Sequence, residues 1–253
     1  MKRMISIWAI YLRRFLRLAP IPTIIFAVIL YPLGVSAQPC DEIDKLITST
    51  PAPPHYPGGW SAYIEELKFA KRGVVDLVLI GDSLAQAWNT KMWSPMRVVN
   101  LGVGGDRTQD VLWRLGSREW QKLRPRKVLI ILGTNNINTD KVCAINFGLL
   151  QVFKRVAAIW PSTQIGFLEI PPRGPRFLDY NDSRTQINAA VRRIPGVKPI
   201  NVDDAITCGW HIPCQNYLDD NVHFTEAGYR VIFKSVMSAL FGSSLPVAPR
   251  QRR

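Results

Sequence analysis

A serine at the end of an apolar run is the first residue of this chain that could do chemistry. Ser83 follows Gly81 and Asp82, and residues 74–80 before them are mostly aliphatic with little polar alternation. Such a run is typical of a strand that is covered on both faces, and the loop after such a strand lies where open α/β sheets bind their ligands. Because Gly-Asp also ends many strands as a simple turn, this stretch alone does not establish a nucleophile. We interpret Asp82 as a hydrogen-bonding residue of the turn.

A base for this serine has to come from the three histidines of the chain. A serine hydroxyl is a poor nucleophile until a base removes its proton, and the usual base is a histidine that a carboxylate orients. His55 precedes the first apolar run and His211 lies between two cysteines, which leaves His223. Asp220, three residues earlier, can reach its imidazole within one turn. The predicted catalytic set is therefore Ser83, Asp220 and His223.

Two further loops could stabilise the oxyanion of an acyl-transfer reaction. Residues 100–106 (NLGVGGD) follow the second apolar run, and residues 133–136 (GTNN) follow the third. Both loops place hydrogen-bond donors beside the serine, and a preorganised donor accelerates such reactions by about two to three orders of magnitude. The glycine loop does not fit a phosphate-binding motif, because Arg107 stands where G-x-G-x-x-G needs its last glycine and the P-loop lysine is missing.

The elements that must position these loops alternate along the chain, which predicts a parallel sheet with helices on both faces. The predicted strands cover Val74–Ile80, Val98–Leu101, Val128–Leu132, Ile165–Ile170 and Pro199–Val202. The predicted helices cover Trp60–Lys71, Leu84–Trp93, Thr108–Leu123, Thr139–Trp160, Asn181–Ile194 and Thr225–Leu240. The loops after the strands all emerge at one edge of the sheet, so a site assembled from them is local in space.

Five residues in this order and context, Gly81, Ser83, Gly105, Asn135 and His223, resemble the SGNH (GDSL-type) hydrolase superfamily. The resemblance implies a flavodoxin-like three-layer α/β/α fold with a five-stranded parallel sheet. It also implies an esterase in which the serine is the nucleophile, the histidine is the base and the aspartate completes the triad. The oxyanion hole would comprise the backbone N–H groups of Ser83 and Gly105 and the side-chain amide of Asn135. No metal or organic cofactor is implied.

Residues 102–115 (GVGGDRTQDVLWRL) narrow the resemblance to the catalytic subunits of intracellular platelet-activating-factor acetylhydrolase and their bacterial relatives. Residues 172–174 fit the same group, and the resemblance extends over residues 74–240. Because those subunits pair, a homodimer is one arrangement open to this chain. An export signal, four cysteines and a longer loop at 207–219 depart from the group and leave the phospholipid substrate in doubt.

We therefore predict an exported serine esterase that removes short acyl groups, acetyl foremost, from acylated carbohydrate or small esters. A lysophospholipase, a thioesterase and an acetyl phospholipid hydrolase are alternatives within the enzymes. An envelope protein that only binds an acylated glycan is the alternative outside them.

The side chains that flank the proposed reacting residues allow more than one interpretation. Leu84 follows the serine and Val222 precedes the histidine, so both are predicted to line the acyl site, with core packing as the alternative. Arg107 and Arg173 lie in loops at the active edge, where we expect solvated charges, with contact to an anionic group as the alternative. Trp113 and Trp120 are expected in the core, because an aromatic stripe on a helix usually packs there.

The amino-terminal segment predicts export. Residues 1–37 run from basic through apolar to small side chains, as a secretory signal does, with cleavage expected after Ala37. An uncleaved membrane anchor is the alternative, and either form places the domain in the periplasm or outside the cell. Residues 38–59 are expected to form a proline-rich lead-in, residues 60–242 the hydrolase domain and residues 243–253 a basic, flexible tail.

Charge and cysteine content limit the partners and the compartment. The formal net charge is +13, but no basic block is interleaved with aromatic residues, so we expect no nucleic-acid partner. The four cysteines allow two disulfides in an oxidising compartment, and we favour Cys208–Cys214 and Cys40–Cys143. A metal site at Cys208, His211 and Cys214 is the less favoured alternative, since it lacks an obvious fourth ligand.

Overall fold

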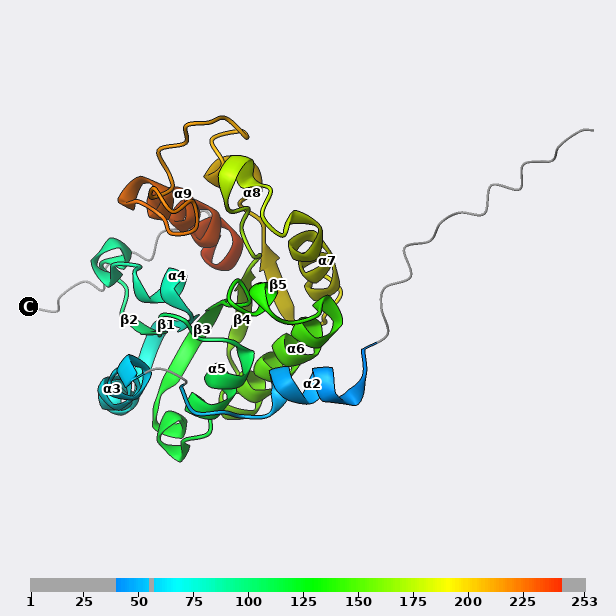
Figure 1. The fold of residues 1–253 in the computed structure, drawn as a ribbon. Coiled ribbons are helices and arrows are strands. Elements are labelled where there is room, and N and C mark those ends of the chain that lie inside the picture. Colours follow the sequence, from blue (N-terminus) through cyan, green and yellow to red (C-terminus); the bar gives the residue numbers. More distant parts are fainter. Residues whose placement is uncertain (1–39, 55–56, 243–253) are drawn as a thin grey trace, which may run out of the picture. The chain divides into compact units, whose positions relative to one another are not determined.

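Five parallel strands form one sheet in the order β2-β1-β3-β4-β5 (Figure 1). A computed structural model describes residues 40–54 and 57–242. The strands are β1 (Val74–Gly81), β2 (Val98–Gly102), β3 (Arg124–Ile131), β4 (Gln164–Leu168) and β5 (Val197–Ile200). This order, with β1 between β2 and β3, is the flavodoxin-like arrangement. The five predicted strands and the predicted three-layer fold are confirmed.

Helices cover both faces of this sheet. The α-helices are α2 (Glu42–Ser49), α3 (Pro57–Leu67), α4 (Ser83–Gln86), α5 (Thr108–Arg114), α6 (Val142–Ile159), α7 (Asn181–Val191), α8 (Asp203–Ile206) and α9 (Glu226–Val236). Short turns of other helix types are η1 (Lys68–Arg72), η2 (Thr90–Trp93), η3 (Arg118–Lys122), η4 (Asn136–Asn138), η5 (Pro175–Phe177) and η6 (Met237–Phe241).

Two apolar clusters lie on opposite faces of the sheet, and β1 contributes alternate residues to each. Val78 and Ile80 pack in the cluster that also contains buried side chains of α5, α6 and α7. Leu77 and Leu79 pack in the other cluster, with side chains of α4, α8 and α9. Burial of both faces explains why the strand lacks polar alternation. By length and composition α6 could cross a membrane, but its buried residues pack in the first cluster, as in a core helix.

Two of the predicted helices are interrupted. The segment predicted as one helix at 84–93 consists of α4 and the turn η2, and the segment at 108–123 consists of α5 and η3. In the first, the buried rings of Trp88 and Trp93 pack against each other with centroids 4.9 Å apart. In the second, Trp120 is fully buried and its indole N–H donates to the Arg114 carbonyl at 2.8 Å. The apolar periodicity reflected the burial of these tryptophans, and the backbone turns between them.

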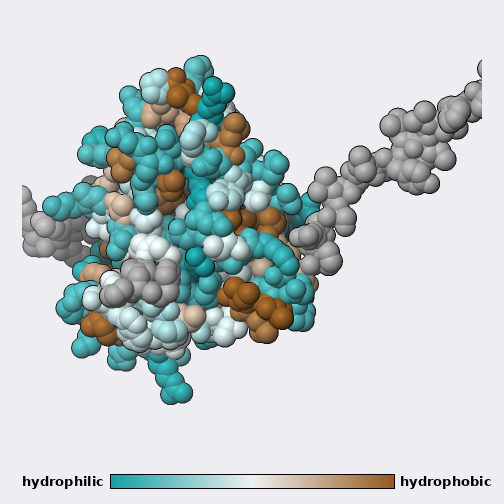
Figure 2. All heavy atoms as spheres, in the orientation of Figure 1, coloured by the Kyte–Doolittle hydropathy of each residue, from teal (hydrophilic) through white to brown (hydrophobic). Residues whose placement is uncertain are grey.

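The lead-in at 38–59 contains a helix that was not predicted. Asp41 caps α2 in a capping box with Asp44, and Thr48 near its end is fully buried. The Thr48 hydroxyl donates to the Ala144 carbonyl of α6 at 2.7 Å. Helix α2 is therefore packed on α6 through Thr48. Its other face exposes three apolar side chains, Ile43, Leu46 and Ile47. Figure 2 shows apolar side chains in separate patches on a largely hydrophilic face of the molecule.

Both favoured disulfides are present, Cys40–Cys143 and Cys208–Cys214. The metal interpretation of Cys208, His211 and Cys214 is therefore wrong, because the sulfur atoms are bonded to each other. Within residues 40–54 and 57–242, no cluster of three or more His, Cys, Asp or Glu residues could hold a metal ion. The predicted signal or anchor at 1–37 and the predicted tail at 243–253 lie outside the described residues.

The two disulfides are expected to stabilise the fold unequally. Cys40 and Cys143 are 103 positions apart, whereas Cys208 and Cys214 are 6 apart. Loop-closure entropy gives about 4.7 kcal/mol for a 100-residue loop and about 3 kcal/mol for a 15-residue loop. We expect replacement of Cys40 and Cys143 by serine to lower the free energy of unfolding more than replacement of Cys208 and Cys214. Urea denaturation of both double variants measures this, and a larger loss from the short loop would contradict the expectation.

Candidate active site

Ser83 is the first residue of α4 and lies directly beyond the carboxyl end of β1. The fully buried Asp82 caps this helix, because its Oδ1 accepts a hydrogen bond from the Leu84 N–H at 2.9 Å. A Cβ atom at Gly81 would lie 1.8 Å from the carbonyl oxygen of Ile131, so the close approach of β3 requires glycine. The turn therefore presents a half-buried serine at a helix start, where backbone N–H groups lack intrahelical partners.

A chain of hydrogen bonds joins Ser83, His223 and Asp220. The Ser83 Oγ lies 2.8 Å from His223 Nε2, and His223 Nδ1 lies 2.6 Å from Asp220 Oδ2. With Nδ1–H donating to the carboxylate, Nε2 is free to accept the serine proton. The side chains of His223 and Asp220 are 35% and 49% exposed, so the imidazole is open to solvent. This is the arrangement of a nucleophile, its base and an orienting carboxylate.

Asp220 is held as an anion by its own turn. Burial alone would raise its pKa, but hydrogen bonds from the backbone and ring of His223 and from the Val222 N–H outweigh this and lower the pKa to about 2. Its Oδ1 accepts both backbone N–H groups at 2.9 Å. The carboxylate therefore stays ionised well below neutral pH.

The turn that carries His223 is held between two short extended segments. Tyr217 and Phe224 form an isolated antiparallel bridge, and the Leu218 N–H donates to the His223 carbonyl at 2.8 Å. Thr225 caps α9 by accepting the Gly228 N–H at 3.2 Å. His223 is thus held by a backbone hydrogen bond to its carbonyl and by the side-chain cap of the helix that follows it.

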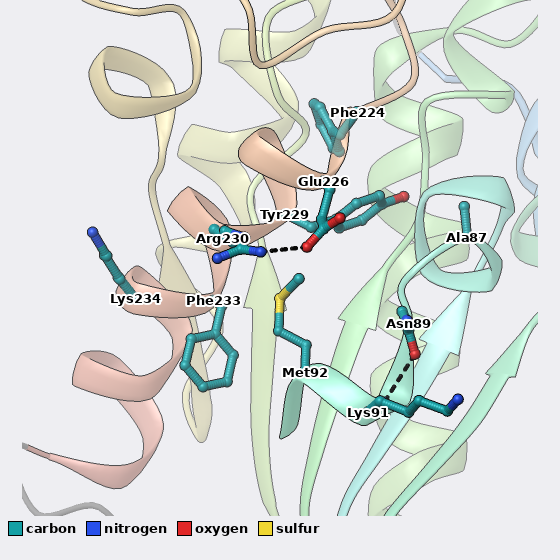
Figure 3. Close-up of a pocket in the computed structure, with 10 residues that line it drawn as sticks. All are labelled: Ala87, Asn89, Lys91, Met92, Phe224, Glu226, Tyr229, Arg230, Phe233 and Lys234. Carbon is teal, nitrogen blue, oxygen red and sulfur yellow. Dashed lines mark hydrogen bonds and ion pairs between the residues drawn. The ribbon is translucent and has the colours of Figure 1, made fainter. Parts of the chain in front are cut away.

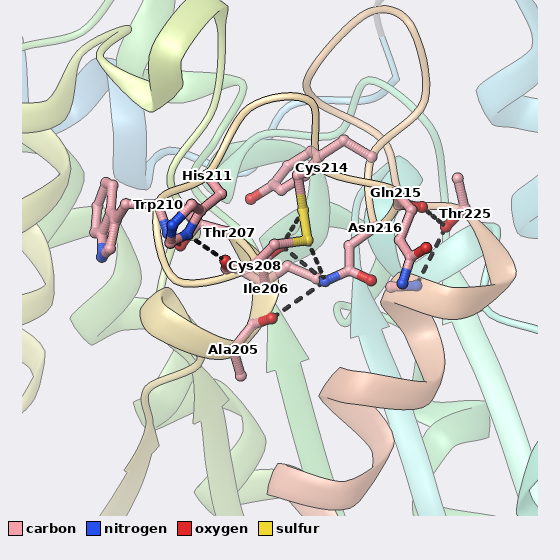
Figure 4. Close-up of a disulfide and its surroundings, with 12 residues drawn as sticks. Ala205, Ile206, Thr207, Cys208, Trp210, His211, Cys214, Gln215, Asn216 and Thr225 are labelled. Carbon is pink, nitrogen blue, oxygen red and sulfur yellow. Dashed lines mark hydrogen bonds between the residues drawn. A yellow bond between two sulfur atoms is a disulfide. The ribbon is translucent and has the colours of Figure 1, made fainter.

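The disulfide Cys208–Cys214 anchors the segment that contains Tyr217 (Figure 4). Asn216, next to the bridge, donates from its side-chain amide to the carbonyls of Ala205 and Ile206, each at 3.1 Å. Its own carbonyl accepts the Thr225 N–H at 3.0 Å. The predicted long loop at 207–219 therefore supports the histidine from outside.

Both predicted oxyanion loops lie beside Ser83. A Cβ atom built on Gly104 would lie 3.7 Å from the Ser83 Cβ, which places the loop that contains Gly105 against Ser83. The side-chain amide of Asn135 donates to the Asp106 carbonyl at 3.0 Å, so it lies against the same loop. The structure thus brings Ser83, Gly105, Asn135 and the histidine to one edge of the sheet.

A buried arginine that was not predicted as part of the site lies beneath these loops. Arg114 is 1% exposed and donates to Asp106 Oδ2 at 2.7 Å and to Glu66 Oε2 at 2.6 Å. It also donates to the carbonyls of Leu101 and Gly81, at 3.1 and 3.4 Å. Despite this cation, burial raises the pKa of Glu66 to about 7 and that of Asp106 to about 6. The sequence signal that could have predicted its burial is the position of Arg114 within the apolar stripe of α5.

The expectation of a solvated Arg173 is wrong. Its side chain is 9% exposed and donates to both the carbonyl and the hydroxyl of Thr134, at 2.9 and 2.8 Å. The neighbouring prolines and glycine of this loop are also buried, so the whole segment packs beneath the active edge. Arg107 is half-buried at the start of α5. As predicted, Trp120 is a core residue, whereas Trp113 is half-buried and packs edge-on against Trp60 and Tyr63.

The two predicted acyl-site residues have different surroundings. Leu84 is 3% exposed and belongs to the apolar cluster that contains side chains of α9, which is the packing role held open for it. Val222 is half-buried in the turn between Asp220 and His223. A role for either in lining the acyl site stays a prediction.

A groove of about 850 Å³ lies between the segment after α4 and helix α9 (Figure 3). Met92 and Phe233 line it from opposite sides, and Glu226 and Arg230 form an ion pair at its border. Neither Ser83 nor His223 lines this groove. Ser83, His223 and Asp220 therefore lie outside the lining of this groove.

A family model described as the GDSL-like Lipase/Acylhydrolase family matches residues 79–231. This chain belongs to that family. The match spans the end of β1, both glycine and asparagine loops and the His223 turn. The GDSL-type assignment from the sequence is confirmed, and the protein is an ester hydrolase.

Relatives of this GDSL hydrolase include the platelet-activating factor acetylhydrolase IB subunit alpha1 of Rattus norvegicus. It is 28% identical over 174 residues, which cover 65% of this chain and 75% of that subunit. The alpha2 subunit from the same organism is 26% identical over 170 residues, which cover 63% of this chain and 73% of the subunit.

Solved structures of similar fold include a lipolytic protein of the G-D-S-L family from Veillonella parvula, with a TM-score of 0.55 and 12% identity, covering 67% of this chain and 99% of that one. A variant of an acetyl xylan esterase from Geobacillus stearothermophilus has a TM-score of 0.54 and 14% identity, covering 69% and 99%. These similarities establish the fold of the GDSL hydrolase, and its two disulfides fit an extracellular protein.

The buried cap of the nucleophile helix predicts how stability depends on pH. Burial, opposed by the hydrogen bond from the Leu84 N–H, raises the pKa of Asp82 to about 7, against about 3.9 in an unfolded chain. Because the folded pKa is the higher one, this contribution to stability is complete below about pH 4 and is lost as the pH rises through 7. We expect Asp82→Asn, which keeps the acceptor for Leu84, to change the melting temperature more favourably at pH 8 than at pH 5.

Thermal unfolding at both pH values measures this difference. Asp219→Asn serves as the control, because it makes the same substitution at an exposed aspartate. A response of Asp82→Asn that does not depend on pH would contradict the expectation.

Proposed function

We propose that this GDSL hydrolase is an exported serine esterase that removes short acyl groups, acetyl foremost, from acylated carbohydrate or small esters. Ser83 is the nucleophile, His223 the base and Asp220 the orienting carboxylate. The backbone N–H groups of Ser83 and Gly105 and the side-chain amide of Asn135 form the oxyanion hole.

The observation that carries this assignment is the unbroken hydrogen-bond chain from Ser83 Oγ through His223 to Asp220. A histidine bonded at Nδ1 to a carboxylate anion has its proton fixed there, so Nε2 is the atom that accepts from serine. The exposure of the imidazole allows a substrate carbonyl to approach the serine from the solvent side.

The reaction proceeds in two acyl transfers. In the first, His223 Nε2 takes the proton as Ser83 Oγ bonds to the ester carbon, and the oxyanion is held by the three donors. The C–O bond then breaks, and the leaving alcohol takes the proton from Nε2, which leaves an acyl-serine. In the second, water repeats these steps and releases the carboxylic acid and free Ser83.

The short acyl group and the carbohydrate substrate are supported by the named relatives and by the compartment. The relatives are named as acetylhydrolases, and one structural neighbour is an acetyl xylan esterase. Esters outside a cell include acylated glycans, and the basic-apolar-small order of residues 1–37 supports export. The disulfides add support, because such bonds persist in oxidising compartments.

Loss of the nucleophile tests the proposed mechanism. We expect Ser83→Ala to lower kcat by about five to six orders of magnitude, and Asp220→Asn by about two to four. Hydrolysis of p-nitrophenyl acetate and labelling by a fluorophosphonate probe measure both the rate and the reactivity of the serine. Ser162→Ala is the control, because Ser162 is exposed in the turn before β4. An unchanged rate in folded Ser83→Ala protein would refute the mechanism.

Acyl length tests the substrate. We expect faster turnover of p-nitrophenyl acetate than of the octanoate, since the proposed acyl group is short. Acetate release from acetylated xylan, acetylated glucosamine polymers and acetyl phospholipids, measured in parallel, then compares leaving groups. Faster hydrolysis of the octanoate, or acetate release from the phospholipids alone, would overturn the proposed substrate.

A further inference from the structure

The loop at 171–174, between β4 and α7, contacts both the turn that contains Asn135 and the turn that contains His223. On one side, Arg173 donates to the carbonyl and the hydroxyl of Thr134, the residue before Asn135. On the other side, the Gly174 N–H donates at 2.8 Å to the carbonyl of Asn221, which lies between Asp220 and His223 in sequence. The loop therefore contacts both the turn of the oxyanion amide and the turn of the base.

Arg173 holds the Asn135 turn from both ends. Of the two terminal nitrogens of its guanidinium, Nη1 donates to Thr134 and Nη2 donates to Oδ1 of Asn138. Asn135 lies between these two partners, at the start of η4. A planar fork that bonds on both sides of a residue restricts the turn more than a single contact does.

Both the side chain and the backbone of Arg173 are held by further contacts. The guanidinium lies over the Tyr180 ring at 4.9 Å from the centroid, and the Asp179 N–H donates to the Arg173 carbonyl at 3.1 Å. The loop is also secured by the Tyr217 hydroxyl, which donates to the Pro172 carbonyl at 2.6 Å. Tyr217 is the residue that bridges to Phe224 beside the base, so the loop is tied twice to the His223 turn.

The charge of this arginine is buried, and no carboxylate of residues 40–54 or 57–242 forms an ion pair with it. Its hydrogen-bond acceptors among the described residues are neutral oxygens, two on Thr134 and one on Asn138. The carboxylates of Asp82 and Asp179 attract it from a longer range. Burial of a cation costs free energy unless its hydrogen bonds compensate it, so the guanidinium depends on its contacts with the Asn135 turn.

We propose that Arg173 is a positioning residue of the oxyanion hole, which holds the Asn135 amide at a fixed place relative to Ser83 and to the His223 turn. The inference rests on the role of Asn135 in the proposed function. Misplacement of such a donor by about 1 Å costs up to about 100-fold in rate, without loss of substrate affinity.

A double-mutant cycle with Asn135 tests this role. We expect Arg173→Met to lower kcat for p-nitrophenyl acetate by about 10- to 100-fold, with KM changed less than about threefold. In an Asn135→Ala background the same substitution should cost less than about threefold, because the donor that Arg173 positions is absent. Affinity for a phenylboronic acid, which forms a tetrahedral adduct on an active serine, should fall in parallel with kcat.

Two further variants complete the experiment. Arg176→Met is the matched control, because Arg176 is an exposed arginine in η5, directly after this loop, and should leave kcat unchanged. Arg173→Lys keeps the charge but cannot bond to Thr134 and Asn138 with one planar fork. It should lose about 3- to 10-fold in kcat, and it replaces Arg173→Met in the cycle if the latter fails to fold.

The outcomes separate this inference from the proposed function. A folded Arg173→Met with wild-type kcat, a loss confined to KM, or losses that multiply fully with Asn135→Ala would each overturn the positioning role. Fluorophosphonate labelling of Ser83 in the wild-type protein is measured alongside. Absence of that labelling would overturn the proposed function itself, whatever the Arg173 variants do.

Discussion

The active edge depends on the burial of one guanidinium. Arg114 compensates its own desolvation through two carboxylates and two backbone carbonyls, and those carbonyls belong to Leu101 of β2 and Gly81 of β1. One of the carboxylates belongs to Asp106 in the oxyanion loop. A buried charge of this kind is tolerated only when every partner is in place, so the cation imposes one geometry on loops that follow different strands. The nucleophile turn and the glycine loop are therefore not independent.

A second arginine acts at the opposite side of the nucleophile, and the two divide the edge between them. Arg114 contacts the carboxyl ends of β2 and β1, whereas Arg173 contacts the turn after β3 from the loop after β4. Strand ends leave backbone carbonyls without ladder partners, and an arginine can satisfy several of them at once. Buried polar contacts thus hold the loops at this edge in place, as apolar packing holds the helices on the two faces of the sheet.

Local patterns predicted the strands and the principal site residues, while long-range burial decided the features that were missed. The strands were readable because both faces are covered, and His223 because only one histidine lay in a suitable context. Arg173 was misjudged because a loop arginine is usually solvated, and nothing nearby in sequence indicates its contact with Thr134. Helix α2 is short, and its stability comes from packing on α6, a contact between segments about 100 residues apart in sequence.

The bond between Cys40 and Cys143 sets an order for the maturation of the chain. Its two cysteines are separated by 103 positions, so the amino-terminal one has to wait while β1, β2 and β3 are synthesised. Thiols stay reduced in a cytosol and pair only where an oxidant is available. Closure of this bond therefore requires both that the segment from β1 to β3 has been synthesised and that an oxidant is available.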